Sequence, residues 1–164
     1  MATEDLIRVR DWDERDSDFY QAVVHRIIPE RTASPRDMAA VGCFMDQVVA
    51  DAGSRPGGVE TYVAVDAGDR PLGLFAIRLD FDHFTNHPRA CVEVLVVSDA
   101  AEGKGVGRAL MRHAEAWGRE HGCREVVLDV FADNEAAIAF YRRVGYQPDH
   151  LRMTKSLVGD ADPD

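Results

Sequence analysis

The stretch VEVLVVSDAAEGKGVGRALM, residues 92–111, runs from an apolar segment through three glycines into a helical pattern. The apolar segment is hydrophobic on both faces, which is typical of a central strand in a covered sheet. The glycines at positions 103, 105 and 107 allow backbone N–H groups to approach a ligand, and the helix start adds unpaired donors and the positive end of its dipole. This stretch therefore predicts a buried strand, a turn suited to phosphate and a helix.

Two common phosphate-binding patterns do not fit this turn. The P-loop pattern GxxxxGK[ST] is absent, because no Gly-Lys pair is followed by Ser or Thr at the required spacing. The dinucleotide pattern GxGxxG fails because Arg108 or Leu110 replaces its third glycine, and Cys123 lies where an acid would bind the ribose. A basic stripe follows at four-residue spacing, formed by Lys104, Arg108 and Arg112. The turn is either a compact anion site or a solvated helix face with glycines used for packing.

The remaining elements are predicted from periodicity and from turn residues. Strands are predicted at 6–12, 59–67, 72–80, 90–98, 125–131 and 150–157, and helices at 16–28, 35–51, 107–122 and 134–145. The turn GDRP between the second and third strands predicts a hairpin. This order of elements predicts a mixed α/β fold with one sheet covered by helices.

The chain has 164 residues, of which 46% are hydrophobic and 29% are charged. This length and composition are typical of one globular domain, which we expect to span residues 1–157. The acidic residues 158–164 are predicted to form a disordered tail.

Composition also narrows the location and the partners. The N-terminal segment is too charged for a signal peptide, and no apolar run reaches the roughly 18 residues that a membrane span needs. Three separated cysteines (Cys43, Cys91 and Cys123) favour reduced thiols in the cytoplasm over a disulfide framework or a zinc site. The net charge of −10 argues against nucleic-acid binding and mildly favours cationic small molecules.

A second block, NEAAIAFYRRVGY at 134–146, lies at the spacing of a known family motif. The first block supplies Gly105 and Gly107 of the pattern Arg/Gln-x-x-Gly-x-Gly/Ala. The second block supplies the pattern Asn-x-x-Ala-x-x-x-Tyr and a later Gly-aromatic pair, at Asn134, Ala137, Tyr141, Gly145 and Tyr146. The sequence thus resembles the GNAT superfamily of acyl-coenzyme A-dependent N-acetyltransferases, most closely over 91–146.

This resemblance implies a single GNAT-like domain with a central sheet, mixed and mostly antiparallel. We expect about six to seven strands, splayed in a V, and about four flanking helices. It also implies that acetyl-CoA binds as co-substrate, with its diphosphate on the glycine turn and its pantetheine arm along the strand that ends at Val97. The residues expected to bind it are Leu95, Val96, Val97, Gly103, Lys104, Gly105, Val106, Gly107, Arg108, Asn134 and Ala137.

Two of these expectations have alternatives. The family pattern has Arg or Gln at position 102, whereas this chain has Glu102, which either points away from the diphosphate or weakens its binding. Asn134 either contacts the coenzyme or only caps its helix. A backbone N–H near Val96 is expected to stabilise the tetrahedral oxyanion.

Glu93 is the candidate general base, because a carboxylate in an apolar strand is either unpaired, with a raised pKa, or ion-paired to an arginine. Its position also matches a glutamate of many family members. Tyr141 is the candidate general acid for the leaving thiolate, and its alternative role is packing on an apolar helix face. His83 and His87 lie in a loop without a third convergent ligand, so no metal site is predicted.

The resulting hypothesis is an enzyme that transfers an acetyl group from acetyl-CoA to a primary amine by direct attack. The acceptor is expected to be a small cationic molecule, with a peptide amine as another option, and the resemblance implies a homodimer. The alternative is a non-catalytic acyl-CoA-binding domain that acts as a sensor or interaction module.

Overall fold

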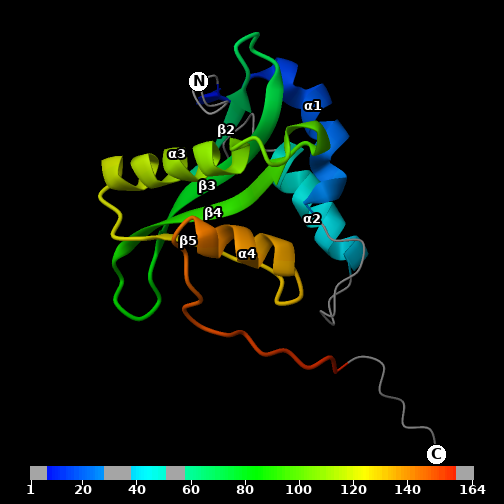
Figure 1. The fold of residues 1–164 in the computed structure, drawn as a ribbon. Helices are drawn as coiled ribbons and strands as arrows, with labels where there is room; N and C mark the ends of the chain where they lie inside the picture. Colours follow the sequence, from blue (N-terminus) through cyan, green and yellow to red (C-terminus); the bar gives the residue numbers. More distant parts are fainter. Residues whose placement is uncertain (1–6, 28–37, 51–57, 158–164) are drawn as a thin grey trace, which may run out of the picture.

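A computed structural model describes residues 7–27, 38–50 and 58–157 (Figure 1). One sheet contains, in spatial order, β1 (Arg8–Asp11), β2 (Glu60–Val65), β3 (Pro71–Phe81), β4 (Pro88–Val97) and β5 (Val126–Leu128). The helices are α1 (Ser17–Val23), α2 (Met38–Ala50), α3 (Val106–Glu120) and α4 (Glu135–Arg143), with 3-10 turns η2 (Glu14–Asp16), η3 (Val24–Arg26) and η6 (Asp99–Ala101). The β4–β5 pair is parallel and the other pairs are antiparallel, which confirms the mixed α/β class and the 59–80 hairpin.

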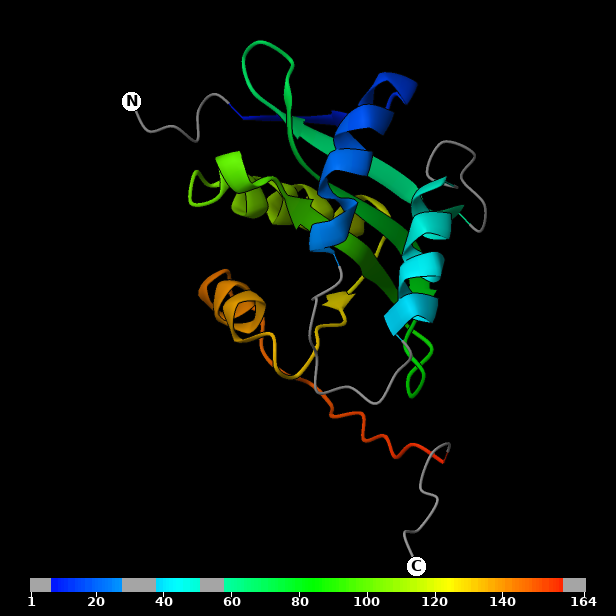
Figure 2. The same cartoon turned by 90° about the vertical axis from the view of Figure 1, so that its right-hand side faces the viewer.

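The sheet separates two hydrophobic clusters. On one face, Leu110 and Trp117 of α3 are buried with Phe75 of β3, and we call this group the α3 cluster. On the other face, Tyr20 of α1 is buried with Leu74 of β3, and we call this group the α1 cluster. Figure 2 shows α1 and α2 on one side of the sheet and α3 and α4 on the other. Both faces of the central strands are therefore covered, as the apolar strand sequence predicts.

A β-bulge in β4 changes which side chains face each cluster. Ala76 pairs with Val94 and Ile77 pairs with Val92, which leaves Glu93 without a partner residue in β3. Before the bulge, Val92 belongs to the α3 cluster, whereas after it Val94 belongs to the α1 cluster. A single inserted residue exchanges the faces because side chains alternate along a strand.

The predicted sixth strand at 150–157 is wrong, and the sheet has five strands rather than six to seven. These residues have no regular secondary structure, and Leu151, Met153 and Leu157 are 74%, 81% and 89% exposed. Alternating apolar residues form a strand only where a sheet edge accepts their hydrogen bonds, and β5 offers an edge of just three residues (126–128). In Figure 1 this segment extends away from the sheet.

Other boundaries also differ from the sequence predictions. The predicted helix at 16–28 is divided into η2, α1 and η3, and position 28 lies outside the described residues. A capping box formed by Asp13 and Asp16 starts η2. The tail 158–164 lies outside the described residues, as do positions 35–37 and 51 of the predicted second helix. Within the described ranges, no helix is both long and apolar enough to cross a membrane.

Candidate functional site

The glycine loop, which we define as residues 102–107, links η6 to α3 through two left-handed glycines. Gly103 has φ of +70° and Gly105, the N-cap of α3, has φ of +85°. L-residues with side chains rarely adopt such conformations, so glycine is required for this path of the backbone. The predicted strand, turn and helix are thus confirmed, with α3 beginning at Val106.

The loop presents backbone donors that no described residue uses. The N–H groups of Gly103 and Gly105 donate no hydrogen bond to any described residue. By contrast, the Gly105 carbonyl accepts a hydrogen bond from the N–H of Ala109 at 3.0 Å. The N-cap glycine has no side chain, so no side chain caps the first turn of α3. These donors and the helix dipole form a cradle that suits an anion.

Gly107 has a different role from the other two glycines. A Cβ atom there would lie 3.0 Å from Cζ of Phe140 in α4, so glycine permits α3 and α4 to approach each other. Packing, which the sequence left as an alternative, therefore explains Gly107. Around Gly103 a Cβ atom would meet nothing within 4 Å, so packing does not explain that glycine.

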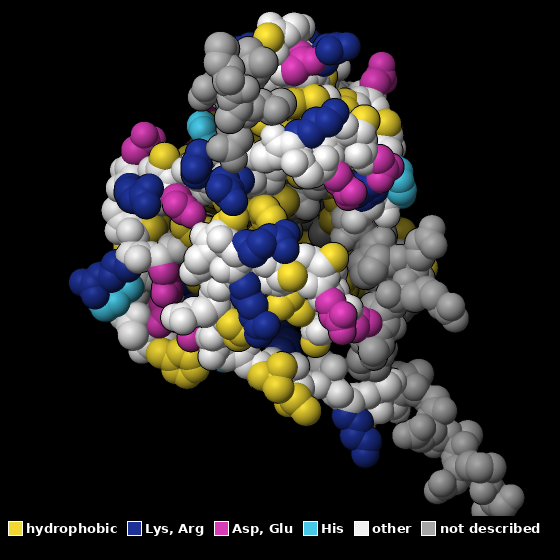
Figure 3. Space-filling view, in the orientation of Figure 1, with side chains coloured by type: hydrophobic (Ala, Val, Ile, Leu, Met, Phe, Trp, Pro, Cys, Tyr) yellow, Lys and Arg dark blue, Asp and Glu magenta, His cyan; other side chains and the backbone are white. Residues whose placement is uncertain are grey.

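Basic side chains surround the glycine loop and continue along α3. Lys104, Arg108 and Arg112 are exposed, and Lys and Arg side chains gather over α3 and α4 in Figure 3. Neither Lys104 nor Arg112 forms an ion pair with another described residue. Lys104 also lines a hollow of about 570 Å³ whose wall includes the ion pair of Arg70 with Asp66. Three basic side chains therefore lie at the loop and along α3 in a chain of net charge −10.

The second half of β4 has an open edge toward β5. The two strands pair only at Ala90–Val92 with Val126–Leu128, whereas β4 continues to Val97. The predicted cofactor residues Leu95, Val96 and Val97 therefore lie beyond the paired segment, between the bulge and the glycine loop. The parting of β4 from β5 leaves backbone groups that an extended ligand arm could bond.

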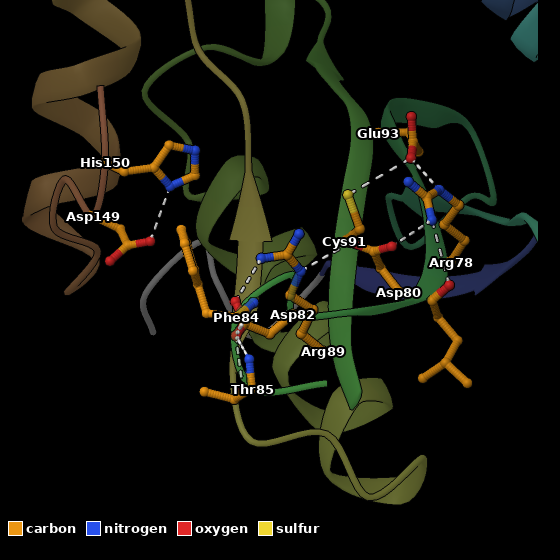
Figure 4. A network of polar contacts seen from close by, with 11 residues as sticks. Arg78, Asp80, Asp82, Phe84, Thr85, Arg89, Cys91, Glu93, Asp149 and His150 are labelled. Carbon is orange, nitrogen blue, oxygen red and sulfur yellow. Dashed lines mark hydrogen bonds and ion pairs between the residues drawn. The ribbon is translucent and has the colours of Figure 1, made fainter. Parts of the chain in front are cut away.

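Glu93, at the bulge, is ion-paired, which is the arrangement that the sequence had left as the alternative. Its Oε1 atom accepts a hydrogen bond from Arg78 Nε and lies 3.6 Å from Cys91 Sγ (Figure 4). No described residue donates to its Oε2 atom. Burial alone would lower the pKa of Arg78, but the hydrogen bond and the charge of Glu93 raise it on balance. One carboxylate oxygen is thus fixed in place and the other is available.

The ion pair of Glu93 continues into a charged ladder along β3 and β4 (Figure 4). Arg78 also forms an ion pair with Asp80 at 3.2 Å. Arg89 forms an ion pair with Asp80 at 2.8 Å and another with Asp82 at 3.3 Å. Burial would raise the pKa of Asp80, but the hydrogen bonds from Arg89, the Phe81 backbone and Arg78 together outweigh burial and lower that pKa. Together with Glu93, the ladder holds three carboxylates against two guanidinium groups.

Cys91 lies beside this ladder with a thiol that resists ionisation. Burial, helped by the negative charge of Glu93, raises its pKa to about 12. Burial also raises the pKa of Cys123. Because the thiolate is the nucleophilic form, neither group is activated near neutral pH.

Tyr141, the predicted general acid, lies on the opposite side of the sheet from Glu93. It projects from α4, packs against the α3 cluster, and has its ring centroid 5.1 Å from Phe140 and 6.0 Å from Tyr146. Burial raises the pKa of its phenol to about 12, so it remains protonated at neutral pH. A ligand between β4 and β5 would therefore have Glu93 on one side and Tyr141 on the other.

Asn134 caps α4, and its Oδ1 atom accepts a hydrogen bond from the Ala137 N–H at 3.1 Å. Helix capping, one of the two roles predicted for Asn134, is thus confirmed. The same hydrogen bond explains why Ala137 lies close to Asn134. A contact of either residue with coenzyme stays a prediction.

Glu102, the departure from the family pattern, is ion-paired to Arg26 at the end of η3. The same guanidinium contacts Asp99 in η6. The sequence did not identify Arg26 and Arg78 as the partners of these carboxylates. Nothing in the order of residues links Arg26 to Glu102, which lies 76 residues away.

Comparison with known proteins assigns this arrangement to a family. A family model described as acetyltransferase (GNAT) family matches residues 11–146, which include β4, the glycine loop, α3 and α4. The chain belongs to the GNAT acetyltransferase family.

Two named relatives and one solved structure agree with the GNAT assignment. The chain is 37% identical over 86 residues to streptothricin acetyltransferase of Streptomyces lavendulae, and 32% identical over 89 residues to aminoglycoside N(6')-acetyltransferase type 1 of Stenotrophomonas maltophilia. These matches cover 52% of this chain and 43% and 58% of the two relatives, so the chain spans about half the length of these relatives. A Pyrococcus furiosus protein described as a candidate acetyl transferase superposes with a TM-score of 0.73 at 25% identity, over 92% of this chain and 99% of that one.

Proposed function

We propose that the protein transfers an acetyl group from acetyl-CoA to a primary amine by direct attack. The observation that supports this proposal most strongly is the glycine loop, whose Gly103 and Gly105 N–H groups have no partner among the described residues, beside the open edge of β4. Backbone donors at a helix start bind a diphosphate, and an unpaired strand edge binds the amides of a pantetheine arm. Both features lie on one short path of chain, at residues 93–107.

The cofactor-binding residues proposed from this geometry form two groups. The loop residues Gly103, Lys104, Gly105, Val106, Gly107 and Arg108 would hold the diphosphate by backbone N–H groups and positive charge. The strand residues Leu95, Val96 and Val97 would bond the arm, and Asn134 and Ala137 would border it from α4. A backbone N–H near Val96 would stabilise the oxyanion that forms on the thioester carbonyl.

Glu93 and Tyr141 are proposed as base and acid on the two sides of the thioester. An alkylamine with a pKa of about 10.4 is almost fully protonated at pH 7, so it must lose a proton before attack. The available Oε2 of Glu93 would accept that proton, while Arg78 fixes Oε1. Tyr141 would donate a proton or a hydrogen bond to the departing thiolate, because its phenol stays protonated.

Direct attack is favoured over a covalent acyl-enzyme. Cys91 is the thiol nearest to Glu93, and its pKa of about 12 keeps it protonated. A protonated thiol is a poor nucleophile, and an acetyl group on Cys91 would need that thiol to be activated first.

A small cationic amine is the proposed acceptor class. The ladder beside Glu93 has an excess of one carboxylate over guanidinium groups, which attracts a cation. One relative is named for aminoglycosides, which fits such an acceptor. We also propose a cytoplasmic location, where the free thiols of the described cysteines remain reduced, and a homodimer.

Release of free coenzyme A thiol tests the proposed activity. We expect thiol release when acetyl-CoA is offered with a panel of di- and polyamines, aminoglycosides and peptide amines, and no release without an amine. Tight binding of acetyl-CoA with no thiol release for any amine would favour the alternative, an acyl-CoA-binding sensor.

Replacing Tyr141 with phenylalanine tests the general acid. We expect turnover to fall at least about tenfold, because the leaving thiolate loses its donor, with little change in acetyl-CoA affinity. Tyr146→Phe is the matched control, since this ring lies 6.0 Å from Tyr141, and it should keep its turnover. Unchanged turnover of Tyr141→Phe would remove Tyr141 from the mechanism.

A further inference from the structure

The glycine loop contains a charge that opposes the ligand proposed for it. Glu102 begins the loop, and Asp99 lies three residues earlier in η6. Two carboxylates beside unpaired backbone donors would repel a diphosphate by Coulomb forces. A loop that binds an anion therefore needs a positive charge close to these two groups.

Arg26 supplies that charge from a distant part of the sequence. Its Nη1 atom contacts Asp99 and its Nη2 atom contacts Glu102. The Arg26 side chain is 22% exposed, whereas the carboxylates are 79% and 61% exposed. Most of the Arg26 side chain is thus covered by protein, whereas the two carboxylates face solvent.

The backbone of Arg26 is fixed by the fold. Arg26 ends η3, which directly follows α1, and the Ile27 N–H bonds the Val24 carbonyl at 3.0 Å. Tyr20 and Val23 of α1 are buried in the cluster with β3 and β4. A guanidinium on such an anchored segment loses little further freedom when it binds a ligand.

The chemistry of guanidinium then suggests its partner. The group has five N–H donors in one plane, and the two contacts with Asp99 and Glu102 leave others for a third acceptor. Guanidinium binds phosphate oxygens with charge-assisted hydrogen bonds that are stronger than neutral ones. We propose that Arg26 is a diphosphate-binding residue of the cofactor site, which delivers a positive charge to the glycine loop, where the family pattern has Arg or Gln at position 102 and this chain has Glu102.

This inference rests on the proposed function, because the diphosphate is that of acetyl-CoA. Asp99 and Glu102 then act as positioning residues, which hold the guanidinium at the loop. Their net charge with Arg26 is −1, and the exposed Lys104 beside them brings the local sum to zero. The acidic residue at 102 is thereby compatible with anion binding.

A pair of variants separates a direct phosphate contact from simple neutralisation of Glu102. Calorimetry with acetyl-CoA should show that Glu102→Gln binds as tightly as the unchanged protein or tighter, because one repulsive charge is removed. The decisive step adds Arg26→Gln to an Asp99→Asn/Glu102→Gln background, in which no carboxylate contacted by Arg26 remains to be neutralised. Affinity should then fall at least about tenfold, because a charge-assisted hydrogen bond to the diphosphate is lost. Equal affinity with and without Arg26→Gln in that background would overturn the inference.

Truncated donors and a matched arginine complete the test. Arg26→Gln should raise the KM for acetyl-CoA but leave the KM for acetyl-pantetheine, which lacks the diphosphate, unchanged. Arg119→Gln, at the far end of α3, should leave both unchanged. Thermal melting checks folding, and Arg26→Lys, which keeps the charge, should lose less affinity than Arg26→Gln. Failure of the unchanged protein to bind acetyl-CoA would overturn the proposed function, whereas normal binding by Arg26→Gln would overturn only the role of Arg26.

Discussion

Replacing Glu93 with glutamine is expected to lower kcat at neutral pH by at least about a hundredfold, with acetyl-CoA affinity retained. The reason is the acceptor: at pH 7, only about one alkylamine in 2,500 is unprotonated when its pKa is about 10.4. Glutamine keeps the size of Glu93 and its hydrogen bond from Arg78, but its amide cannot take a proton. Steady-state thiol release together with calorimetry measures the two quantities.

The pH profile distinguishes a base from a structural carboxylate. Below the pKa of the amine, the residual rate of Glu93→Gln should rise about tenfold per pH unit, because the unprotonated acceptor then comes from solution. Glu60→Gln is the matched control, because Glu60 is a half-buried strand carboxylate that pairs with Ile77, next to Arg78, but is hydrogen-bonded to Tyr62 and Trp117. Retention of more than a tenth of kcat by Glu93→Gln at pH 7 would exclude Glu93 as the base.

Replacing Gly103 with valine is expected to weaken acetyl-CoA binding at least about thirtyfold, through loss of about 2 kcal/mol of charge-assisted hydrogen bonding. A β-branched residue is strained at φ of +70°, so the loop must change its path and turn its N–H groups away from the diphosphate. Calorimetric titration measures the loss.

Gly122 offers a closely matched control for that variant. It also has φ of +70°, and a Cβ atom there also meets nothing within 4 Å, but it lies after the C-terminal end of α3. Gly122→Val should therefore lower the melting temperature as much as Gly103→Val does while binding acetyl-CoA normally. Equal binding by the two variants would show that the loop N–H groups do not hold the ligand.

Local sequence signals were sufficient for much of the fold. The turn GDRP between two apolar segments predicted the β2–β3 hairpin, and the run from the apolar strand through the glycines predicted β4, the loop and α3. Asn134 was predicted as a helix cap and is one. In each case the decisive interactions join residues that are close in sequence.

The features that sequence could not give depend on contacts between distant segments. The bulge at Glu93 appears only when β4 is registered against β3, since VEVLVV is apolar at both odd and even positions. The contact of Arg26 with Glu102 depends on how α1 packs on the sheet. The predicted strand at 150–157 is wrong for a related reason, because the alternation of apolar and polar residues does not reveal whether a sheet edge is free to pair with the segment.

The ion pair of Glu93 shows the same limit at the site itself. From sequence, Glu93 could be unpaired or bonded to an arginine, and the pairing of β3 with β4 brings Arg78 opposite Cys91 and within reach of Glu93. Candidate residues could therefore be named from the two motifs, but not the partners that fix their orientation.

A crystal structure of the protein with coenzyme A tests the central claim most directly. We predict diphosphate oxygens within about 2.7–3.2 Å of the Gly103 and Gly105 nitrogens, with the pantetheine arm along the open edge of β4. A complex in which coenzyme A lies elsewhere, or in which those two N–H groups bond only to protein, would contradict the account.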